Sequence, residues 1–272
     1  MKPNAHYTEI AFILDRSGSM KSCQQAAIDG FNRFLADQQQ IEGLAKLTLV
    51  LFDDEYFVPI SSIPVQEIVP LTDDTYQPQG CTALLDAIGK TVDDLGLRLA
   101  ALAEKDRPGQ VIVAILTDGV ENASQRFNWK EIAGKIKHQT DTYKWIFLFL
   151  GANQDAIATA SNLSIAANNA ANYVADTAGS RAGQAAFSRK MSALRRSSMD
   201  IASVSEKLDA AASLTDIVSE EDRKSRESLK DHRPHDHRPY LPSTCSELPA
   251  PCCHLSQMFA SVRAGLRAQP RD

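Results

Sequence analysis

Two patterns of hydrophobic residues alternate along residues 1–150. Short, nearly continuous apolar runs, rich in β-branched and aromatic residues, predict strands that are buried on both faces. These runs occupy residues 8–14, 46–52, 111–116 and 144–150. Between them, apolar residues recur at the spacing of helices with one buried face. The helical segments are residues 22–38, 85–102 and 129–136.

The order of these elements predicts an α/β fold. The charged turn at residues 53–55 leads directly into residues 56–60, a spacing typical of a hairpin that ends in an antiparallel edge strand. The other strands alternate with helices, which predicts a Rossmann-like, mostly parallel sheet with helices on both faces. Further helices are expected over the alanine-rich residues 154–175 and over residues 184–208.

Composition narrows the class of protein. With 272 residues, 43% of them hydrophobic and 23% charged, the chain matches a soluble globular protein with a buried core. Its net charge of -5 at pH 7 provides no general attraction to nucleic acid or to an anionic membrane. No apolar run approaches the roughly 20 residues that span a bilayer, and the first residues lack the apolar segment of a signal peptide. We therefore expect a cytoplasmic protein that binds neither nucleic acid nor membrane.

The end of the chain differs in composition from the rest. Half of the 12 prolines, three of the five cysteines and three of the six histidines lie in residues 234–272. A zinc site is disfavoured because there is no Cys-x₂-Cys pair and prolines interrupt any scaffold for four ligands. We predict one domain over residues 1–180, a helical extension over residues 181–225, and a disordered or non-native tail over residues 226–272.

Oxygen-bearing side chains gather where the predicted strands end. The first strand is followed by Asp15, Ser17 and Ser19, which offer one carboxylate and two hydroxyls at alternate positions. Thr82 stands near the start of a predicted helix, and Asp118 follows a later strand. In open α/β sheets, ligands bind beyond the carboxyl ends of the strands. Because all of these side chains offer oxygen, the pattern predicts a site for a hard cation.

Three motifs carry a resemblance to a known family. They are Asp-x-Ser-x-Ser at residues 15–19, Gly-x-Thr-x-Leu at residues 80–84 and Thr-Asp-Gly at residues 117–119. Together they resemble the von Willebrand factor A (vWA) domain with its metal-ion-dependent adhesion site, over roughly residues 6–180. Residues 116–122 and 145–154 look especially like small bacterial and phage-associated members.

The resemblance implies how such a site would work. The hydroxyls of Ser17, Ser19 and Thr82 would bind Mg²⁺ or Mn²⁺ directly, while Asp15 and Asp118 would bind mainly through coordinated waters. In vWA domains the open position on the ion takes a carboxylate from a partner protein. The chain is therefore expected to be a metal-dependent protein-binding domain and not an enzyme.

Cys81 departs from the family pattern, because members frequently have a glycine at this position. A side chain there could crowd the loop. We interpret Cys81 as a small buried packing residue, since sulfur is a poor ligand for Mg²⁺.

Two further functions stay open. The chain could be an accessory subunit of a separate ATPase, or of a stress-response or phage system, or it could catalyse metal-assisted phosphoryl transfer. A haloacid-dehalogenase phosphatase needs a second carboxylate two positions after its first aspartate, where this chain has Ser17. The sequence also contains no phosphate-binding P-loop motif, so the chain is not itself a P-loop ATPase.

Two charged segments could be either functional sites or ordinary parts of the protein surface. The carboxylates at residues 53–55 could form a second cation site, but a charged hairpin turn is the preferred interpretation. The basic, serine-rich residues 188–198 could dock an acidic partner or accept phosphate. We interpret them as the solvated face of a helix.

Overall fold

The computed structural model describes residues 3–152 and 156–231. Two predictions concern the end of the chain: a disordered or non-native tail, and the absence of a zinc site in it. From residue 232 onward, the residues of that tail lie outside the described part. The helix that precedes them, α7, continues to Asp231. The division of the chain at residues 180 and 225 stays a prediction.

Six strands form one sheet in the order β3-β2-β1-β4-β5-β6. The strands are β1 (Asn4–Asp15), β2 (Leu44–Phe52), β3 (Tyr56–Pro64), β4 (Pro108–Thr117), β5 (Ile146–Ala152) and β6 (Ala170–Tyr173). β3 pairs with β2 in the antiparallel direction, and all other neighbouring strands are parallel. The predicted mostly parallel sheet with one antiparallel edge strand is therefore confirmed.

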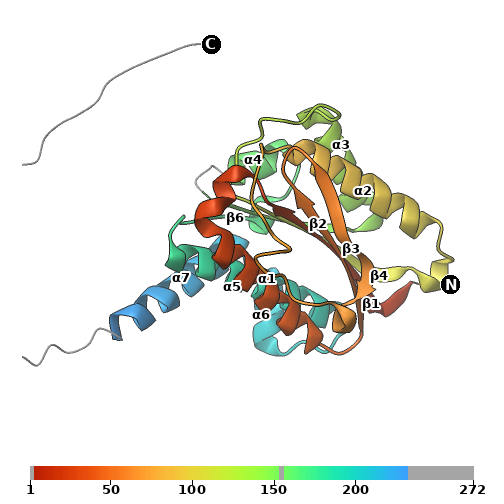
Figure 1. Cartoon of the computed structure of the whole chain (residues 1–272). Coiled ribbons are helices and arrows are strands. Elements are labelled where there is room, and N and C mark those ends of the chain that lie inside the picture. The colour runs from red at the N-terminus through yellow and green to blue at the C-terminus, as the bar shows by residue number, and fades with distance from the viewer. Residues whose placement is uncertain (1–2, 153–155, 232–272) are drawn as a thin grey trace, which may run out of the picture. The chain divides into compact units, whose positions relative to one another are not determined.

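Helices cover both faces of the sheet, which confirms the predicted α/β class. One face packs against α1 (Gln24–Gln39), α5 (Thr177–Ser198) and α7 (Leu214–Asp231). The other packs against α2 (Leu84–Ala100), α3 (Trp129–Tyr143) and α4 (Ala156–Asn162). A further helix, α6 (Val204–Ala211), packs on α5. Figure 1 shows α2 and α3 above the sheet and α1, α5 and α6 below it.

None of the helices in the parts of the chain described above is long and apolar enough to cross a bilayer.

The prediction of helix throughout residues 154–175 is wrong. After the short helix α4, the chain forms β6, which extends the sheet beside β5 and buries Ala170 and Ala171 completely. Alanine favours helix in isolation, but hydrogen bonding to a neighbouring strand and burial between two layers outweigh that preference here. The small side chains also allow close packing, since the hydroxyl of Thr215 in α7 donates to the carbonyl of Ala170 at 3.1 Å.

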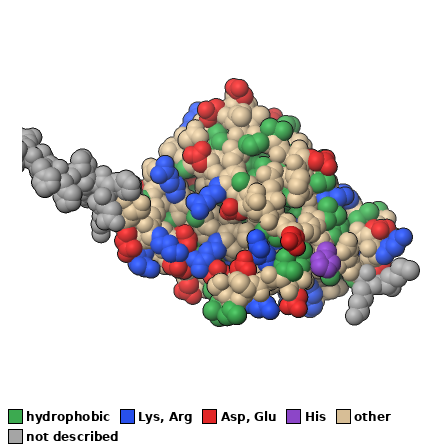
Figure 2. Space-filling view, turned by 90° about the horizontal axis from the view of Figure 1, so that it is seen from below, with side chains coloured by type: hydrophobic (Ala, Val, Ile, Leu, Met, Phe, Trp, Pro, Cys, Tyr) green, Lys and Arg blue, Asp and Glu red, His purple; other side chains and the backbone are tan. Residues whose placement is uncertain are grey.

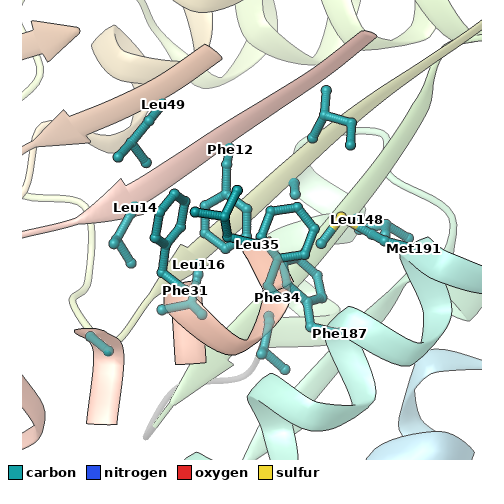
Figure 3. Close-up of a cluster of buried hydrophobic side chains, with 14 of the residues drawn as sticks. Phe12, Leu14, Phe31, Phe34, Leu35, Leu49, Leu116, Leu148, Phe187 and Met191 are labelled. Atoms are coloured by element: carbon teal, nitrogen blue, oxygen red, sulfur yellow. The ribbon is translucent and has the colours of Figure 1, made fainter. Parts of the chain in front are cut away.

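Four phenylalanines join the central strand to two helices on one face of the sheet. The ring of Phe12 in β1 lies 5.4 Å from that of Phe31 and 5.0 Å from that of Phe34, both in α1. It also lies 6.0 Å from the ring of Phe187 in α5. Figure 3 shows these rings together with the surrounding leucines and Met191. The core on this face therefore includes α5, most of which follows residue 180.

Replacing Phe187 with alanine tests how strongly α5 belongs to the domain. Phe187 is 1% exposed, so the substitution leaves a cavity and should lower the free energy of unfolding by about 3–5 kcal/mol. Urea denaturation measures this change. The control is Phe57→Ala on the edge strand, where the side chain is 50% exposed and the loss should be about 1 kcal/mol or less. Equal small losses in the two variants would show that α5 is not part of the core.

The interpretation of residues 188–198 as a solvated helix face is wrong for most of the basic side chains. Lys190 is 1% exposed, and its ammonium donates to the backbone carbonyls of residues 209, 210 and 212. Arg195 is fully buried and donates to the backbone carbonyl of residue 38. Arg189 forms ion pairs with Asp209, Glu220 and Glu221. Figure 2 shows Lys and Arg interspersed with Asp and Glu on the lower face of the molecule. The partners of Arg189 and Lys190 come from α6, α7 and the residue after α6, and the partner of Arg195 comes from α1. A pattern confined to α5 could not reveal them.

Candidate metal centre

The five predicted site residues come from three loops at one edge of the sheet. β1 and β4 are adjacent and parallel, so the segments that follow Asp15 and Thr117 emerge side by side. The third segment carries Thr82 and leads into α2, which begins at Leu84. The structure therefore brings together residues that are about one hundred positions apart in the sequence.

Asp15 forms the buried end of this site. Its side chain is fully buried. One carboxylate oxygen accepts the backbone N–H of Ser17 at 2.6 Å, and the other accepts the hydroxyl of Thr117 at 2.5 Å. The hydroxyl of Tyr76 donates to the backbone carbonyl of Asp15 at 2.5 Å. Contacts from Ser17 and Thr117 thus set the position of the carboxylate, and Tyr76 holds the backbone of the same residue.

A chain of hydrogen bonds joins the two serines to the second carboxylate. The hydroxyl oxygens of Ser17 and Ser19 lie 3.1 Å apart, and Ser19 donates to Oδ1 of Asp118 at 2.6 Å. Ser17 is buried, whereas Ser19 is exposed. The site therefore runs from the buried carboxylate of Asp15 to an opening at the protein surface.

Gly119 leaves room for Thr82 next to Asp15. A Cβ atom placed on Gly119 would lie 2.5 Å from Oγ1 of Thr82 and 3.2 Å from Oδ2 of Asp15. Both oxygens therefore lie beside the same point. Thr82 is held there by Asn122, whose side-chain oxygen accepts its N–H at 2.9 Å and whose N–H donates to its carbonyl at 3.0 Å. Asn122 was missed as a positioning residue, although it stands within the 116–122 segment that the resemblance singled out.

The hairpin turn between β2 and β3 braces the site loops. The guanidinium of Arg16 lies 3.1 Å from the carboxylate of Asp53, which is 1% exposed. Asp54 accepts the backbone N–H of Cys81 at 3.1 Å. Gly80 has a φ of +66°, and a Cβ there would lie 1.9 Å from the Asp54 carboxylate. The preferred interpretation of residues 53–55 as a hairpin turn is confirmed, and two of its carboxylates bind protein groups.

The thiol of Cys23 contacts one of the predicted site residues. Cys81 is exposed, so its interpretation as a buried packing residue is wrong. The Cys23 thiol lies 3.8 Å from Oδ2 of Asp118. Burial, reinforced by the nearby carboxylate of Asp118, raises the pKa of this thiol to about 12, so it stays protonated and donates to the carboxylate. The signal available in the sequence was spacing, because Cys23 stands one helical turn after Ser19.

The two carboxylates lie in a desolvated environment. Burial raises the pKa of Asp15 to about 6, despite hydrogen bonds from Thr117 and Ser17 that favour the charged form. Burial also raises the pKa of Asp118. In the described part of the chain, neither carboxylate forms an ion pair with a lysine, arginine or histidine. The site therefore holds one fully buried and one partly buried acidic group without a positive partner among the described residues.

The side chains present fit a hard divalent cation. Three hydroxyls and two carboxylates supply oxygen donors alone, as Mg²⁺ and Mn²⁺ prefer. Within residues 3–152 and 156–231, no group of three or more His, Cys, Asp or Glu could hold a metal ion. A softer ion that needs nitrogen or sulfur ligands is therefore not matched by this donor set.

No protein-family model matches the chain, and no curated protein matches it. Several solved structures are similar. The VWA2 protein from Sulfolobus acidocaldarius, an ArnB paralog, has a TM-score of 0.45 and 15% identity over 68% of this chain and 45% of its own. A von Willebrand factor type A protein from Catenulispora acidiphila has a TM-score of 0.44 and 15% identity over 71% of this chain and 42% of its own. This chain thus spans less than half the length of either protein.

A third similar structure is the manganese-loaded TRAP protein from Plasmodium vivax. It has a TM-score of 0.46 and 16% identity over 65% of this chain and 72% of its own. At such identities the likeness is one of fold, so the function proposed below rests on the contacts of the site itself.

Proposed function

We propose that this chain is a vWA-type domain that binds a partner protein through a divalent cation. Mg²⁺ or Mn²⁺ would be held directly by the hydroxyls of Ser17, Ser19 and Thr82 and, mainly through coordinated waters, by the carboxylates of Asp15 and Asp118. The observation that carries this proposal is a fully buried carboxylate, Asp15, beside the partly buried carboxylate of Asp118, with hydroxyls around them and no basic partner among the described residues. A bound cation would offset the cost of burying these charges.

The environment of the site suits a metal that takes one ligand from outside. When bound, the ion supplies an electrophilic centre, because hydroxyl ligands are neutral and neutralise little of its charge. Asp15 anchors the closed end, whereas Ser19 and the 67% exposed Val120 border the surface. A carboxylate is the protein group that a hard cation prefers. We therefore propose an acidic residue of the partner as the incoming ligand, and a binding role without catalysis.

A pull-down experiment tests the need for the metal in partner binding. The immobilised full chain should capture its partner from a lysate of the native source in Mg²⁺, lose it in EDTA and regain it when Mg²⁺ is restored. Asp118→Ala should capture nothing, because one of the two site carboxylates is missing. Asp73→Ala, which removes an exposed carboxylate in a surface loop, is the matched control and should behave as the native chain. A partner that is retained in EDTA would contradict bridging by the metal.

A further inference from the structure

A pocket of about 380 Å³ adjoins the proposed metal centre. Asp118 lines it on the side of the metal centre, and Cys23 and Asp29 line it from the segment that begins α1. Tyr173 at the end of β6 and Arg181 in the first turns of α5 complete its walls. The volume falls within the roughly 300–1,000 Å³ of small-ligand pockets, so it can take a side chain next to one that reaches the metal.

Arg181 is the one lysine or arginine among the described residues that line this pocket. Its side chain is exposed, and within residues 3–152 and 156–231 it forms no hydrogen bond or ion pair. The other arginines further along α5 are all engaged. Arg189 pairs with acidic residues of α6 and α7, Arg195 donates to Gln38, and Arg196 pairs with Glu206. A free guanidinium beside a pocket is a ready partner for a carboxylate.

The acidic residues of the pocket differ in how far their charges are already compensated. Asp176 accepts the N–H of Gly179 at 2.7 Å and pairs with Arg226 at 3.1 Å. Asp118 belongs to the proposed metal centre. Among the residues that the structure describes, Asp29 accepts only the side-chain amide of Gln25, at 2.8 Å. With the metal present, Arg181 is therefore the attractive group for an anion in this pocket and Asp29 is the repulsive one.

We propose that the pocket is a second subsite for the partner, which presents two carboxylates on one short segment. This inference rests on the proposed function: one carboxylate reaches the metal, and the second reaches the guanidinium of Arg181 while its side chain occupies the pocket. A planar guanidinium can bind a carboxylate through two parallel hydrogen bonds. The metal centre then requires one acidic residue in the partner, and Arg181 favours a second acidic residue close to it.

Selection from a library of random short peptides displayed on phage tests this subsite. The full chain is immobilised in Mg²⁺, and bound phage are released with EDTA. We expect peptides with two acidic residues close together from the native chain, and peptides with a single acidic residue from Arg181→Gln. Synthetic copies of the two-acid peptides should bind Arg181→Gln roughly tenfold more weakly, as loss of a charge-assisted hydrogen bond predicts.

Two further variants sharpen the comparison. Asp29→Asn should bind the two-acid peptides roughly two- to fivefold more tightly, because it removes a like charge at an exposed position. Arg33→Gln makes the same substitution as Arg181→Gln at an exposed position of α1 that does not line the pocket, and it should leave binding unchanged.

The possible results separate the subsite from the metal-dependent function. If peptides are released by EDTA but bind Arg181→Gln as tightly as the native chain, the subsite is overturned and the proposed function stands. If no peptide is released by EDTA while the chain still binds Mn²⁺, the proposed function is overturned and the subsite with it. Selection of peptides with a basic residue beside the acidic one would also overturn the subsite, because Asp29 would then be the attractive group.

Discussion

Replacing Asp15 with asparagine should abolish Mn²⁺ binding while leaving the fold intact. Asparagine has the same shape, and it can still accept the N–H of Ser17 that now lies 2.6 Å from Oδ1. What it removes is a negative charge that is fully buried and whose burial costs free energy unless a cation compensates it. The metal-free variant should therefore be at least as stable as the metal-free native chain.

Calorimetric titration with Mn²⁺ and denaturation in EDTA measure the two effects separately. The native chain should release or absorb heat on titration and gain stability with saturating metal, because a ligand that binds the folded state stabilises it. Asp15→Asn and Asp15→Ala should do neither. Asp73→Ala should match the native chain, since that carboxylate lies in an exposed loop. Equal heats in the native and Asp15 variants would reject the metal centre.

Replacing Gly119 with alanine should weaken Mn²⁺ binding by about 100-fold without removing any oxygen donor. The added methyl group would lie 2.5 Å from Oγ1 of Thr82, which is closer than nonbonded atoms can approach. Since Thr82 is held at both its N–H and its carbonyl by Asn122, the hydroxyl must move away from Asp15. A loss of Mn²⁺ affinity would then show that binding depends on the positions of the oxygen atoms, because all of them are still present.

Gly134→Ala is the matched control for this substitution. A Cβ atom at Gly134 meets nothing within 4 Å, and the residue lies inside α3. Alanine there should leave Mn²⁺ affinity unchanged and raise the free energy of unfolding by roughly 0.5–1 kcal/mol. Native affinity in Gly119→Ala would show that Thr82 does not take part in the site.

The sequence could predict the candidate site because its residues stand at recognisable local positions. Asp15 and Asp118 each follow a buried apolar strand, and Thr82 precedes a helix with a clear apolar face. Parallel strands place their carboxyl ends at one edge of a sheet, so local patterns were enough to bring the segments together. That the five side chains bind a metal stays a prediction until it is measured.

The groups that surround the site could not be predicted in the same way. Arg181 follows Asp118 by more than sixty positions and lines the same pocket only because β6 and α5 return to the sheet beside β5. Asp53 stabilises the site through Arg16, a partner supplied by another loop. Such contacts depend on tertiary packing and leave no periodic signal in the sequence.

By itself the sequence determined the order of most elements, the mostly parallel sheet with its antiparallel edge strand, and the clustering of oxygen donors at the strand ends. These features follow from hydrophobic periodicity and chain direction, which are local. Only the tertiary structure decided that Ala170–Tyr173 forms a strand, that α5 belongs to the core, and that its basic residues are mostly buried or paired. The physical reason is that burial and charge pairing depend on segments distant in the chain, and these can outweigh the preference of any single segment.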